Sequence, residues 1–502
     1  MLTEQGYCGC LKGENCGHTD RGKMMRRINL QSSQIVLLLV ACAIAVVFGL
    51  VLPVLAAALD GSFAKLAALP VLLLLGGLFL FNKRLLLLCV LLLRASGDIV
   101  LESTRVGSGG GFSLGLGGAI NALIILIAFL FVVEKPKLLP RKAWMPWLIL
   151  LGIATIGMVV SPDRGAALKI VLGLCSYFAV FVCAFYVVRT PEQFRSMILL
   201  VVASSLIPAT YGIISTVLNA RGGLSGFRLQ STFGHPNIFA FYLTLVIALG
   251  LYIIKSAQFK LDQFQRFTLA GYLGVLFVLL LLTQTRSAWV ACFLIFLLYG
   301  IKYERRYLVY MLVLATLAML VPSVQERILQ LDSGNTVTTY AKLNSFAWRT
   351  YLWSSGLNWM SPSRYLFGYG VEAFPFYSPL FFPLAGGVNW GAHSVFVQWF
   401  FDTGVVGMVA YLAIFYQVLR VLIRYQKHDS LGGVILICTL IEYLVVSASD
   451  NMLSYLAFNW YFWLVMGMGW SLYLNSEEGR QESIVKKNQR RESSSLSRST
   501  SA

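Results

Sequence analysis

Apolar residues in this chain occur in long uninterrupted runs and not at the spacing of amphipathic helices or strands. Most runs are about 16 to 25 residues long, the length that an α-helix needs to cross a hydrocarbon core of roughly 30 Å. Lipid cannot hydrogen-bond the backbone, so a crossing segment must satisfy its own N–H and C=O groups, as a helix does. The pattern therefore predicts an all-α integral membrane protein with about 12 to 14 transmembrane helices.

Candidate spans number about fourteen if modest tilt and local thinning of the bilayer are allowed. They lie near residues 35–58, 66–82, 85–101, 114–133, 143–160, 168–188, 197–218, 238–254, 267–285, 287–301, 306–321, 394–419, 432–448 and 453–474. The runs that flank Lys83–Arg84 and Arg286 are the shortest, so a pair of them could form one hairpin that does not cross fully.

Basic residues gather in alternate loops between these spans, and such loops are retained on the cytoplasmic side during insertion. They are Lys83 and Arg84; Lys135, Lys137, Arg141 and Lys142; Arg189 and Arg195; Lys255, Lys260 and Arg266; Lys302, Arg305 and Arg306; and Arg420, Arg424 and Lys427. Basic residues of both terminal segments fall on the same side. We therefore predict a multi-pass protein of the inner, cytoplasmic membrane with both termini cytoplasmic and an even number of spans.

The same pattern divides the chain into five segments. They are a cytoplasmic leader (1–33), a first set of transmembrane helices (34–321), a large outer-face loop (322–393), a second set of transmembrane helices (394–474) and a cytoplasmic tail (475–502). The tail is rich in serine and is expected to be disordered. Because the first apolar run begins well inside the chain and further spans follow it, we interpret it as a retained helix and not as a cleaved signal peptide.

Composition supports a membrane protein, because 58% of the residues are hydrophobic and only 12% are charged, about half the charged fraction of a soluble domain. The net charge of +18 lies mostly in predicted cytoplasmic segments facing anionic lipid, so nucleic-acid binding is not needed to explain it. None of the nine cysteines lies in a predicted outer loop, so no disulfide framework is expected. Cys8, Cys10, Cys16 and His18 could bind zinc, but their spacing matches no common structural site, which favours reduced thiols.

Polar residues that the basic loops do not explain gather on the predicted outer face. The segment 226–237 carries Arg228 and His235 and runs into a helix that is expected to begin at Ile238, with Pro236–Asn237 as the helix-entry signal and Asn237 as the N-cap. Capping of a helix explains Asn237 as well as ligand binding does. It does not explain a positive charge at Arg228.

A second outer group lies in the segment 283–289, a tight turn between two spans that contains Arg286 and Trp289. An arginine near hydrocarbon is costly unless it reaches lipid phosphate or meets another anion. Both explanations stay open for Arg286 on this ground alone.

The third outer group is the loop of about seventy residues from 322 to 392, far longer than a usual connection between packed helices. It places Trp348 and Trp353 around Arg349 in a helical stretch and closes on His393 at the start of the next span. A lone histidine at a helix start is more often an interfacial residue than a catalytic base, and spacing alone leaves both open.

Together these segments put arginines, histidines and aromatic side chains on one side of the bilayer. Arginine offers a fixed fork of donors that suits phosphate oxygens, so converging arginines at headgroup depth favour a diphosphate over a neutral ligand. A histidine, with an unperturbed pKa of about 6.5, could deprotonate an incoming hydroxyl. Aromatic faces would stack on sugar rings.

At these residues the chain resembles the O-antigen ligase and O-antigen polymerase superfamily of bacterial envelope glycosyltransferases, from about the fifth span onward. The resemblance rests on residues 233–240, 283–289, Trp348–Arg349 with Trp353, 367–370, and His393 with 404–407. No single motif is specific, but their order and spacing around one long outer loop are. The span count exceeds that expected of such ligases, and the leader and tail have no counterpart in them.

The resemblance implies a membrane glycosyltransferase without metal, nucleotide or other cofactor. It would transfer a glycan from a polyprenyl diphosphate carrier, such as undecaprenyl diphosphate, to a hydroxyl of a saccharide or lipid acceptor on the outer face. It implies that Arg286 and Arg349 hold the diphosphate and that His393 acts on the acceptor, with electrostatic stabilisation of the leaving group contributing most to catalysis. Candidate substrate-binding residues are Arg228, His235, Asn237, Trp289, Trp348 and Trp353. Polymerisation of O-antigen or exopolysaccharide and ligation of a finished polymer are both compatible with these motifs.

A transporter or flippase of a small molecule or lipid-linked sugar is the alternative from another class. It needs ionisable or broken-helix sites near the midplane, for which Glu442, Asp402 and the pair Arg94–Asp98 are the candidates, the last spaced as a structural ion pair. A transporter gives no function to the long outer loop. A structural scaffold, the third alternative, would need neither the arginines nor the histidine.

Overall fold

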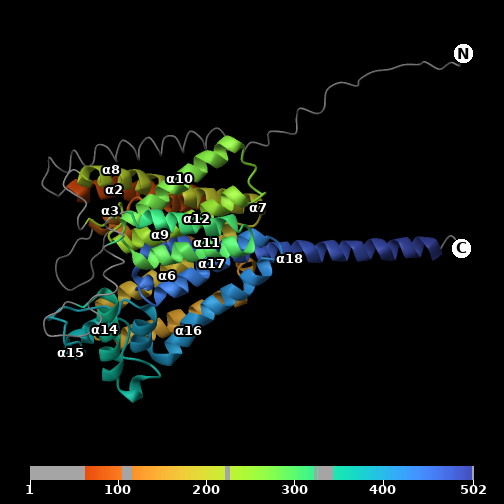
Figure 1. Cartoon of the computed structure of the whole chain (residues 1–502). Coiled ribbons are helices and arrows are strands. Elements are labelled where there is room, and N and C mark those ends of the chain that lie inside the picture. Colours follow the sequence, from red (N-terminus) through yellow and green to blue (C-terminus); the bar gives the residue numbers. More distant parts are fainter. Residues whose placement is uncertain (1–62, 104–115, 221–226, 321–324, 326–342, 500–502) are drawn as a thin grey trace, which may run out of the picture. The chain divides into compact units, whose positions relative to one another are not determined.

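The computed structural model describes residues 63–103, 116–220, 227–320, 325 and 343–499. Within these ranges every regular element is an α-helix or a short 3-10 helix (Figure 1). The predicted all-α class is therefore confirmed. The predicted run 35–58 and the leader 1–33, with its candidate zinc ligands, lie outside the described residues.

Nine helical segments among the described residues are long and apolar enough to cross a membrane, which confirms a multi-span membrane protein. They lie in α2 (Phe63–Leu93), α4 (Leu116–Glu134), α5 (Arg141–Val159), α6 (Arg164–Val187), α7 with α8 (Pro191–Ala203, Leu206–Ala220), α9 (Pro236–Lys255), α10 (Gln263–Leu282), α16 (Val395–Tyr425) and α17 (Ser430–Ser447). Helices α11 (Arg286–Lys302) and α12 (Arg306–Ala318) also occupy predicted runs. The 17 residues of α11 are at the lower limit for a crossing, and the 13 residues of α12 are fewer than a full crossing needs.

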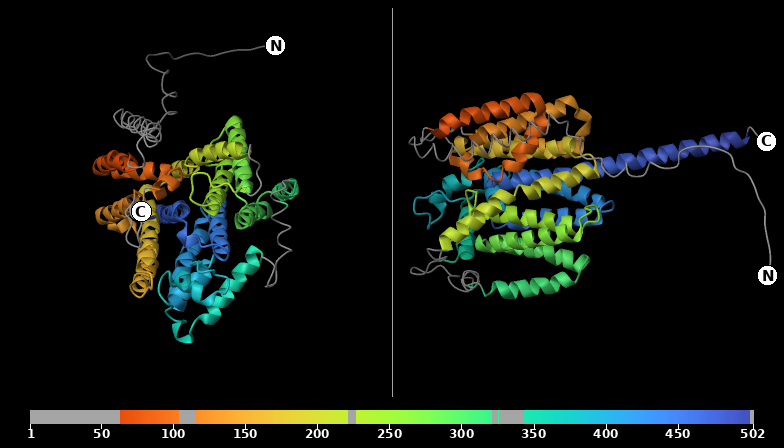
Figure 2. Two further views of the ribbon diagram at one scale, coloured as in Figure 1. Left: turned by 90° about the vertical axis from the view of Figure 1, so that its left-hand side faces the viewer. Right: turned by 90° about the horizontal axis from the view of Figure 1, so that it is seen from above.

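The chain divides into two compact units, Met1–Leu73 and Leu74–Ala502. In the second unit α6 packs against α4, α5 and α18 (Leu456–Ser499), while α9, α10, α11 and α17 pack among themselves (Figure 2). Ring contacts of Trp463 with Trp147 and Phe181 join α18 to α5 and α6. The sites described below all belong to this second unit.

Helix α2 contains the break predicted at Lys83–Arg84. Backbone φ and ψ at Asn82 are −156° and 81°, and Asn82 Oδ1 accepts a hydrogen bond from the Leu85 N–H, as a cap does for a new helical start. The part after this break ends at Leu93 and is followed by the short α3 (Asp98–Ser103). The span predicted at 85–101 is therefore shorter than expected, because the helix stops before Ser96–Gly97.

The run predicted as one span at 197–218 is interrupted between α7 and α8. Hydroxyls of Ser204 and Ser205 donate to the carbonyls of Val201 and Val202 and also contact tyrosine hydroxyls of neighbouring helices. Serine side chains compete in this way with the regular backbone pattern of a helix. A hydropathy pattern does not predict this interruption of the helix, because the flanking residues are mostly apolar.

Helix α18 continues to Ser499, so the prediction of disorder from residue 475 is wrong. Extending an existing helix avoids the cost of nucleation, and glutamate, lysine, arginine and glutamine are good helix formers. In this segment the helix formers outweigh the serines.

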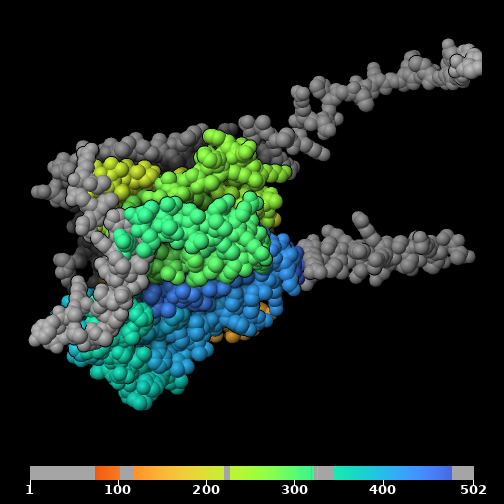
Figure 3. Space-filling model, in the orientation of Figure 1, coloured from red at the N-terminus to blue at the C-terminus, as the bar shows by residue number. Residues whose placement is uncertain are grey.

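From residue 343 onward, where the structure describes it, the long loop between α12 and α16 contains helices of its own. Helix α14 (Ser345–Trp359) is followed by η2 (Pro362–Arg364) and by α15 (Ala373–Phe381), and α14 and α15 pack against each other and against α16. Their core includes Leu352, Phe374 and Phe401. These helices lie at the end of the second unit that is on the left in Figures 1 and 3, opposite to the end from which α18 projects in Figure 1. We call these the loop end and the tail end.

Candidate active site

His393 lies immediately before α16 in a backbone conformation that few residues other than glycine adopt. Its φ is +48°, in the left-handed region that costs other residues about 1 kcal/mol or more. Hydrogen bonds fix the preceding residue: the Ala392 N–H donates to Gln398 Oε1 (3.2 Å), and the Trp353 indole N–H donates to the Ala392 carbonyl (2.5 Å). Ser394 then caps the first turn of α16. The surrounding protein therefore holds the histidine in a fixed turn.

Helix α14 supplies side chains around the imidazole. Trp348 packs edge-on against the His393 ring, with centroids 6.1 Å apart, and also contacts Trp390 and Phe382. Arg349, the next residue on α14, is half-buried and its charge acts on His393. Among the described residues, the Arg349 guanidinium has no hydrogen-bond partner, so its donors remain available to a ligand.

The electrostatic surroundings keep His393 neutral. Burial lowers the pKa of its imidazole, and the positive charges of Arg349 and of a protonated His235 lower it further, while the Asp450 carboxylate acts in the opposite direction. The imidazole is therefore uncharged at pH 7, the state in which a ring nitrogen can accept a proton. Charged and titratable groups from α14 and from the segments before α9, before α16 and after α17 thus meet at the loop end.

Two of the predicted binding residues, Arg228 and Asn237, are bonded to each other. Arg228 Nη2 donates to Asn237 Oδ1 at 2.9 Å and to the Thr285 hydroxyl at 3.3 Å, and its Nε donates to the Thr283 carbonyl. The Thr285 hydroxyl also donates to Asn237 Oδ1. These contacts tie the loop before α9 to the turn between α10 and α11.

The hydrogen bonds of Arg228 and Asn237 continue to the carboxylate of Asp450. Asp450 is 1% exposed, and its carboxylate accepts hydrogen bonds from Asn237 Nδ2 (3.0 Å), the Tyr455 hydroxyl (2.6 Å) and the Ser287 hydroxyl (3.2 Å). A buried charge persists only when it is well hydrogen-bonded. The three donors supply that compensation.

His235 replaces Asn237 as the N-cap of α9, so the expected cap is wrong by two residues. Its Nδ1 accepts a hydrogen bond from the Asn237 N–H, and the Asn237 side chain instead bridges Arg228 and Asp450. Burial and the Arg228 charge lower the pKa of His235, and Asp450 opposes them.

Arg286 connects α11 to α14. It is the first residue of α11, and its Nη2 donates to the Ser345 hydroxyl at 2.6 Å. Ser345 and Arg349 are four residues apart on α14, so they lie on the same helix face about one turn apart. Arg286 therefore contacts the face of α14 on which Arg349 lies, so the two predicted diphosphate-binding arginines are on one side of this helix.

The predicted tryptophans are positioned differently from one another. The indole N–H groups of Trp289 and Trp353 donate to the carbonyls of Leu280 and Ala392, so both are used within the protein. Trp289 packs against the transmembrane core. Trp348 is the one of the three whose ring contacts His393.

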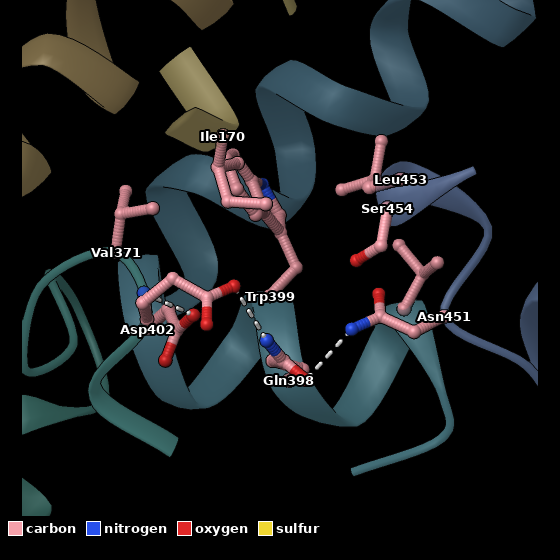
Figure 4. Close-up of a pocket in the computed structure, with 10 residues that line it drawn as sticks. Ile170, Val371, Gln398, Trp399, Asp402, Asn451, Leu453 and Ser454 are labelled. Atoms are coloured by element: carbon pink, nitrogen blue, oxygen red, sulfur yellow. Dashed lines mark hydrogen bonds between the residues drawn. The ribbon is translucent and has the colours of Figure 1, made fainter. Parts of the chain in front are cut away.

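A second polar cluster, which the sequence did not reveal as a unit, adjoins the segment before His393 through the bond between Gln398 and Ala392. A cavity of about 10 Å³, room for about one water molecule, is lined by Ile170, Val371, Glu372, Val395, Gln398, Trp399, Asp402, Asn451, Leu453 and Ser454 (Figure 4). The buried Asp402 carboxylate accepts from the backbone N–H groups of Glu372 and Phe374. Asp402, a candidate transport residue by sequence, therefore anchors the start of α15.

The other transport candidates lie away from this cluster. Arg94 and Asp98 form an ion pair of 2.8 Å, with Arg94 also stacked over Trp460. Glu442 is buried on α17, and its Oε2 has no hydrogen-bond partner within the described residues. Neither observation connects these residues to one pathway.

The fold and the cluster at the loop end define a polytopic membrane protein in which arginines, a neutral histidine and a buried carboxylate come together. Residues 271–412 match the family model described as O-antigen ligase, which supports the resemblance of the chain to the O-antigen ligase and polymerase superfamily. The matched range contains Arg286, Arg349 and His393 but not Asp450. No curated protein matches the chain.

Proposed function

We propose that this membrane enzyme transfers a glycan from a polyprenyl diphosphate to an acceptor hydroxyl, in polymerisation or ligation of a cell-surface polysaccharide. The observation that carries the proposal is the pairing of a neutral, half-buried His393 with Arg349, whose donors have no partner among the described residues. The first is suited to take a proton and the second to bind an anion.

Arg286 and Arg349 would bind the diphosphate. Arg286 contacts the face of α14 that carries Arg349. Each guanidinium can offer a planar pair of N–H donors to phosphate oxygens. As the bond to the sugar breaks, negative charge grows on the diphosphate, so these contacts strengthen in the transition state. Arg228 is bonded to Asn237, which is bonded to Asp450, so Arg228 would support the site through Asp450.

His393 would act on the acceptor. Its unprotonated ring nitrogen takes the proton of the acceptor hydroxyl, and the oxygen lone pair attacks the anomeric carbon of the donor. The bond from that carbon to the phosphate oxygen breaks, and its electron pair leaves with the polyprenyl diphosphate. His393 then returns the proton to solvent or to the released phosphate. The Trp348 face beside the imidazole would stack on a sugar ring of the acceptor.

We also propose that the loop end is the outer side of the cytoplasmic membrane. The basic segment that contains Lys427 contacts the start of the tail, where His428 pairs with Glu477, and this agrees with retention of basic loops and of the tail in the cytoplasm.

The test is a host lacking this gene, complemented with wild type or with His393→Ala at equal membrane levels. We expect His393→Ala to lose at least about a hundredfold of surface polymer, as removal of a general base does. Single lipid-linked repeats accumulating in the variant would indicate a polymerase, and long unattached polymer would indicate a ligase.

Full restoration by His393→Ala would refute His393 as the base and favour a transporter. His428→Ala, at the tail end, is the matched control and should restore the wild-type pattern.

A further inference from the structure

A chain of polar side chains leads from Glu372 to the backbone beside His393. The Glu372 carboxylate accepts from Gln398 Nε2 at 3.2 Å. At the other end of the same amide, Gln398 Oε1 accepts from the Ala392 N–H at 3.2 Å and from Asn451 Nδ2 at 2.9 Å. Gln398 is 5% exposed, so bulk water does not compete for these bonds. Figure 4 shows the hydrogen bond between Gln398 and Asn451.

The direction of these hydrogen bonds indicates that Glu372 orients the side-chain amide of Gln398. A glutamine side chain has one donor end and one acceptor end. Two donors, from Ala392 and Asn451, require the oxygen of Gln398 on their side, so the NH2 group must find an acceptor on the other. An ionised carboxylate can only accept, and it accepts more strongly than a neutral group. Glu372 in its charged form therefore fixes the orientation of Gln398.

Gln398 in turn touches both segments that carry the reactive groups. Ala392 directly precedes His393, and Asn451 directly follows Asp450. One buried amide therefore holds the residue before the histidine and the residue after the carboxylate that acts on it. A small displacement of either segment changes the distance between the base and the acceptor, to which rates are sensitive.

We propose that Glu372 is a positioning residue of the transfer reaction: ionised, it orients Gln398, and Gln398 holds the segments that carry His393 and Asp450. The proposal rests on the function proposed above. Protonation of Glu372 removes the charge-assisted bond and allows the carboxyl to donate, so the hold on Gln398 weakens and turnover falls.

The surroundings allow this change of charge near neutral pH. Groups that face Glu372 are Asp402 on α16, whose carboxylate binds its N–H, and Asp163 at the start of α6. Burial and the Asp163 charge raise the pKa of Glu372 to about 7, against the opposing effect of its bond to Gln398. The adjoining cavity has room for about one water molecule, through which a proton can arrive.

Exchange of the two side chains tests the direction of the bonds. Gln398→Glu alone sets two carboxylates against each other with no donor between them. In the double variant Glu372→Gln with Gln398→Glu, the carboxylate at 398 still accepts from Ala392 and Asn451, and the amide at 372 becomes the donor. Turnover is measured with full-length protein in lipid nanodiscs, using lipid-linked glycan extracted from the gene-deleted host as donor.

We expect Gln398→Glu to lower kcat about tenfold or more, with a smaller change in KM, and the double variant to recover most of that loss. Glu372→Gln alone retains a neutral acceptor and should lose only a few-fold at pH 8, but it should lose the fall in kcat as pH drops through about 7. A double variant no better than Gln398→Glu, or a pH profile unchanged in Glu372→Gln, would overturn the proposal.

Two controls separate this proposal from others. Asp163→Asn keeps a good N-cap for α6 but removes the charge facing Glu372, so it should lower the pKa of Glu372 and move that fall in kcat to lower pH. His393→Ala in the same assay tests the function proposed above. If His393→Ala is inactive while the exchanged variants behave as wild type, the positioning proposal alone fails.

Discussion

At the scale of single residues, the site is defined by opposing charges on one imidazole. Burial lowers the pKa of His393 most, the Arg349 charge lowers it further, and the Asp450 carboxylate acts in the opposite direction. His393 is therefore neutral at pH 7 although a carboxylate acts on it. A histidine that serves as a base requires this state, because a protonated imidazole cannot accept a proton.

This balance predicts opposite shifts for two substitutions. Arg349→Gln should raise the pKa of His393, and Asp450→Asn should lower it. Both variants are expected to lose activity, so the pKa is measured without turnover, from the pH dependence of His393 modification by diethyl pyrocarbonate, which attacks the neutral imidazole. Asp429→Asn, at the tail end, is the matched control and should leave the midpoint unchanged. Shifts in the same direction would contradict the assigned geometry.

The sequence predicted part of this residue set. Arg286, Arg349 and His393 stand out because a charged or titratable residue at an outer membrane boundary needs an explanation. Asp450 did not, because it follows an apolar run in a short loop and its partners are far away in sequence. Only the folded chain shows that Asn237, Ser287 and Tyr455 converge on it.

At the scale of elements, the decisive contact is the docking of the loop after η2 onto a break in α16. Gly404 has φ +65° and ψ −165°, and the freed N–H groups of Val405 and Val406 donate to the carbonyls of Tyr365 and Leu366. Gly368 lies against the backbone of Asp402. The break therefore fixes the loop that leads to Glu372 and α15.

Two glycines with similar backbones test this contact. Gly368 and Gly386 have φ of +69° and +60°, but a Cβ at Gly368 would overlap the Asp402 carbonyl oxygen, whereas at Gly386 nothing lies within 4 Å. Gly386→Ala should cost only the left-handed strain, about 1 kcal/mol. Gly368→Ala must also displace backbone and should cost several times more. Thermal unfolding in detergent compares them, and equal losses would show that the loop is not docked in this way.

Helix positions could be predicted from hydropathy more readily than helix interruptions. Long apolar runs gave α4, α5, α6, α9 and α10 close to their observed bounds. The separation of α7 from α8 depends on serine hydroxyls bonded to the helix itself, and the break in α16 depends on a loop distant in sequence. Neither contact changes the average hydropathy of a window.

At the scale of the whole molecule, the proposed sidedness gives a direct prediction. Ser363 and Lys427 are exposed at the loop end and near the start of the tail, respectively. In intact cells, an impermeant maleimide should label Ser363→Cys but label Lys427→Cys only after the membrane is permeabilised. Native cysteines are controlled for by the wild-type chain. The reverse pattern would place the site in the cytoplasm and remove the proposed donor side.

The left-handed backbone at His393 sets stability against activity at one position. Glycine adopts a φ of +48° without strain, so a chain with glycine at 393 should unfold less readily at that turn, by about 1 kcal/mol, offset in part by the greater freedom of glycine in the unfolded chain. Under the proposed function, the native residue is the one that the reaction needs and not the one that the turn favours. Engineering for heat resistance guided by backbone geometry alone would replace this residue first, and would remove the proposed base from a more stable protein.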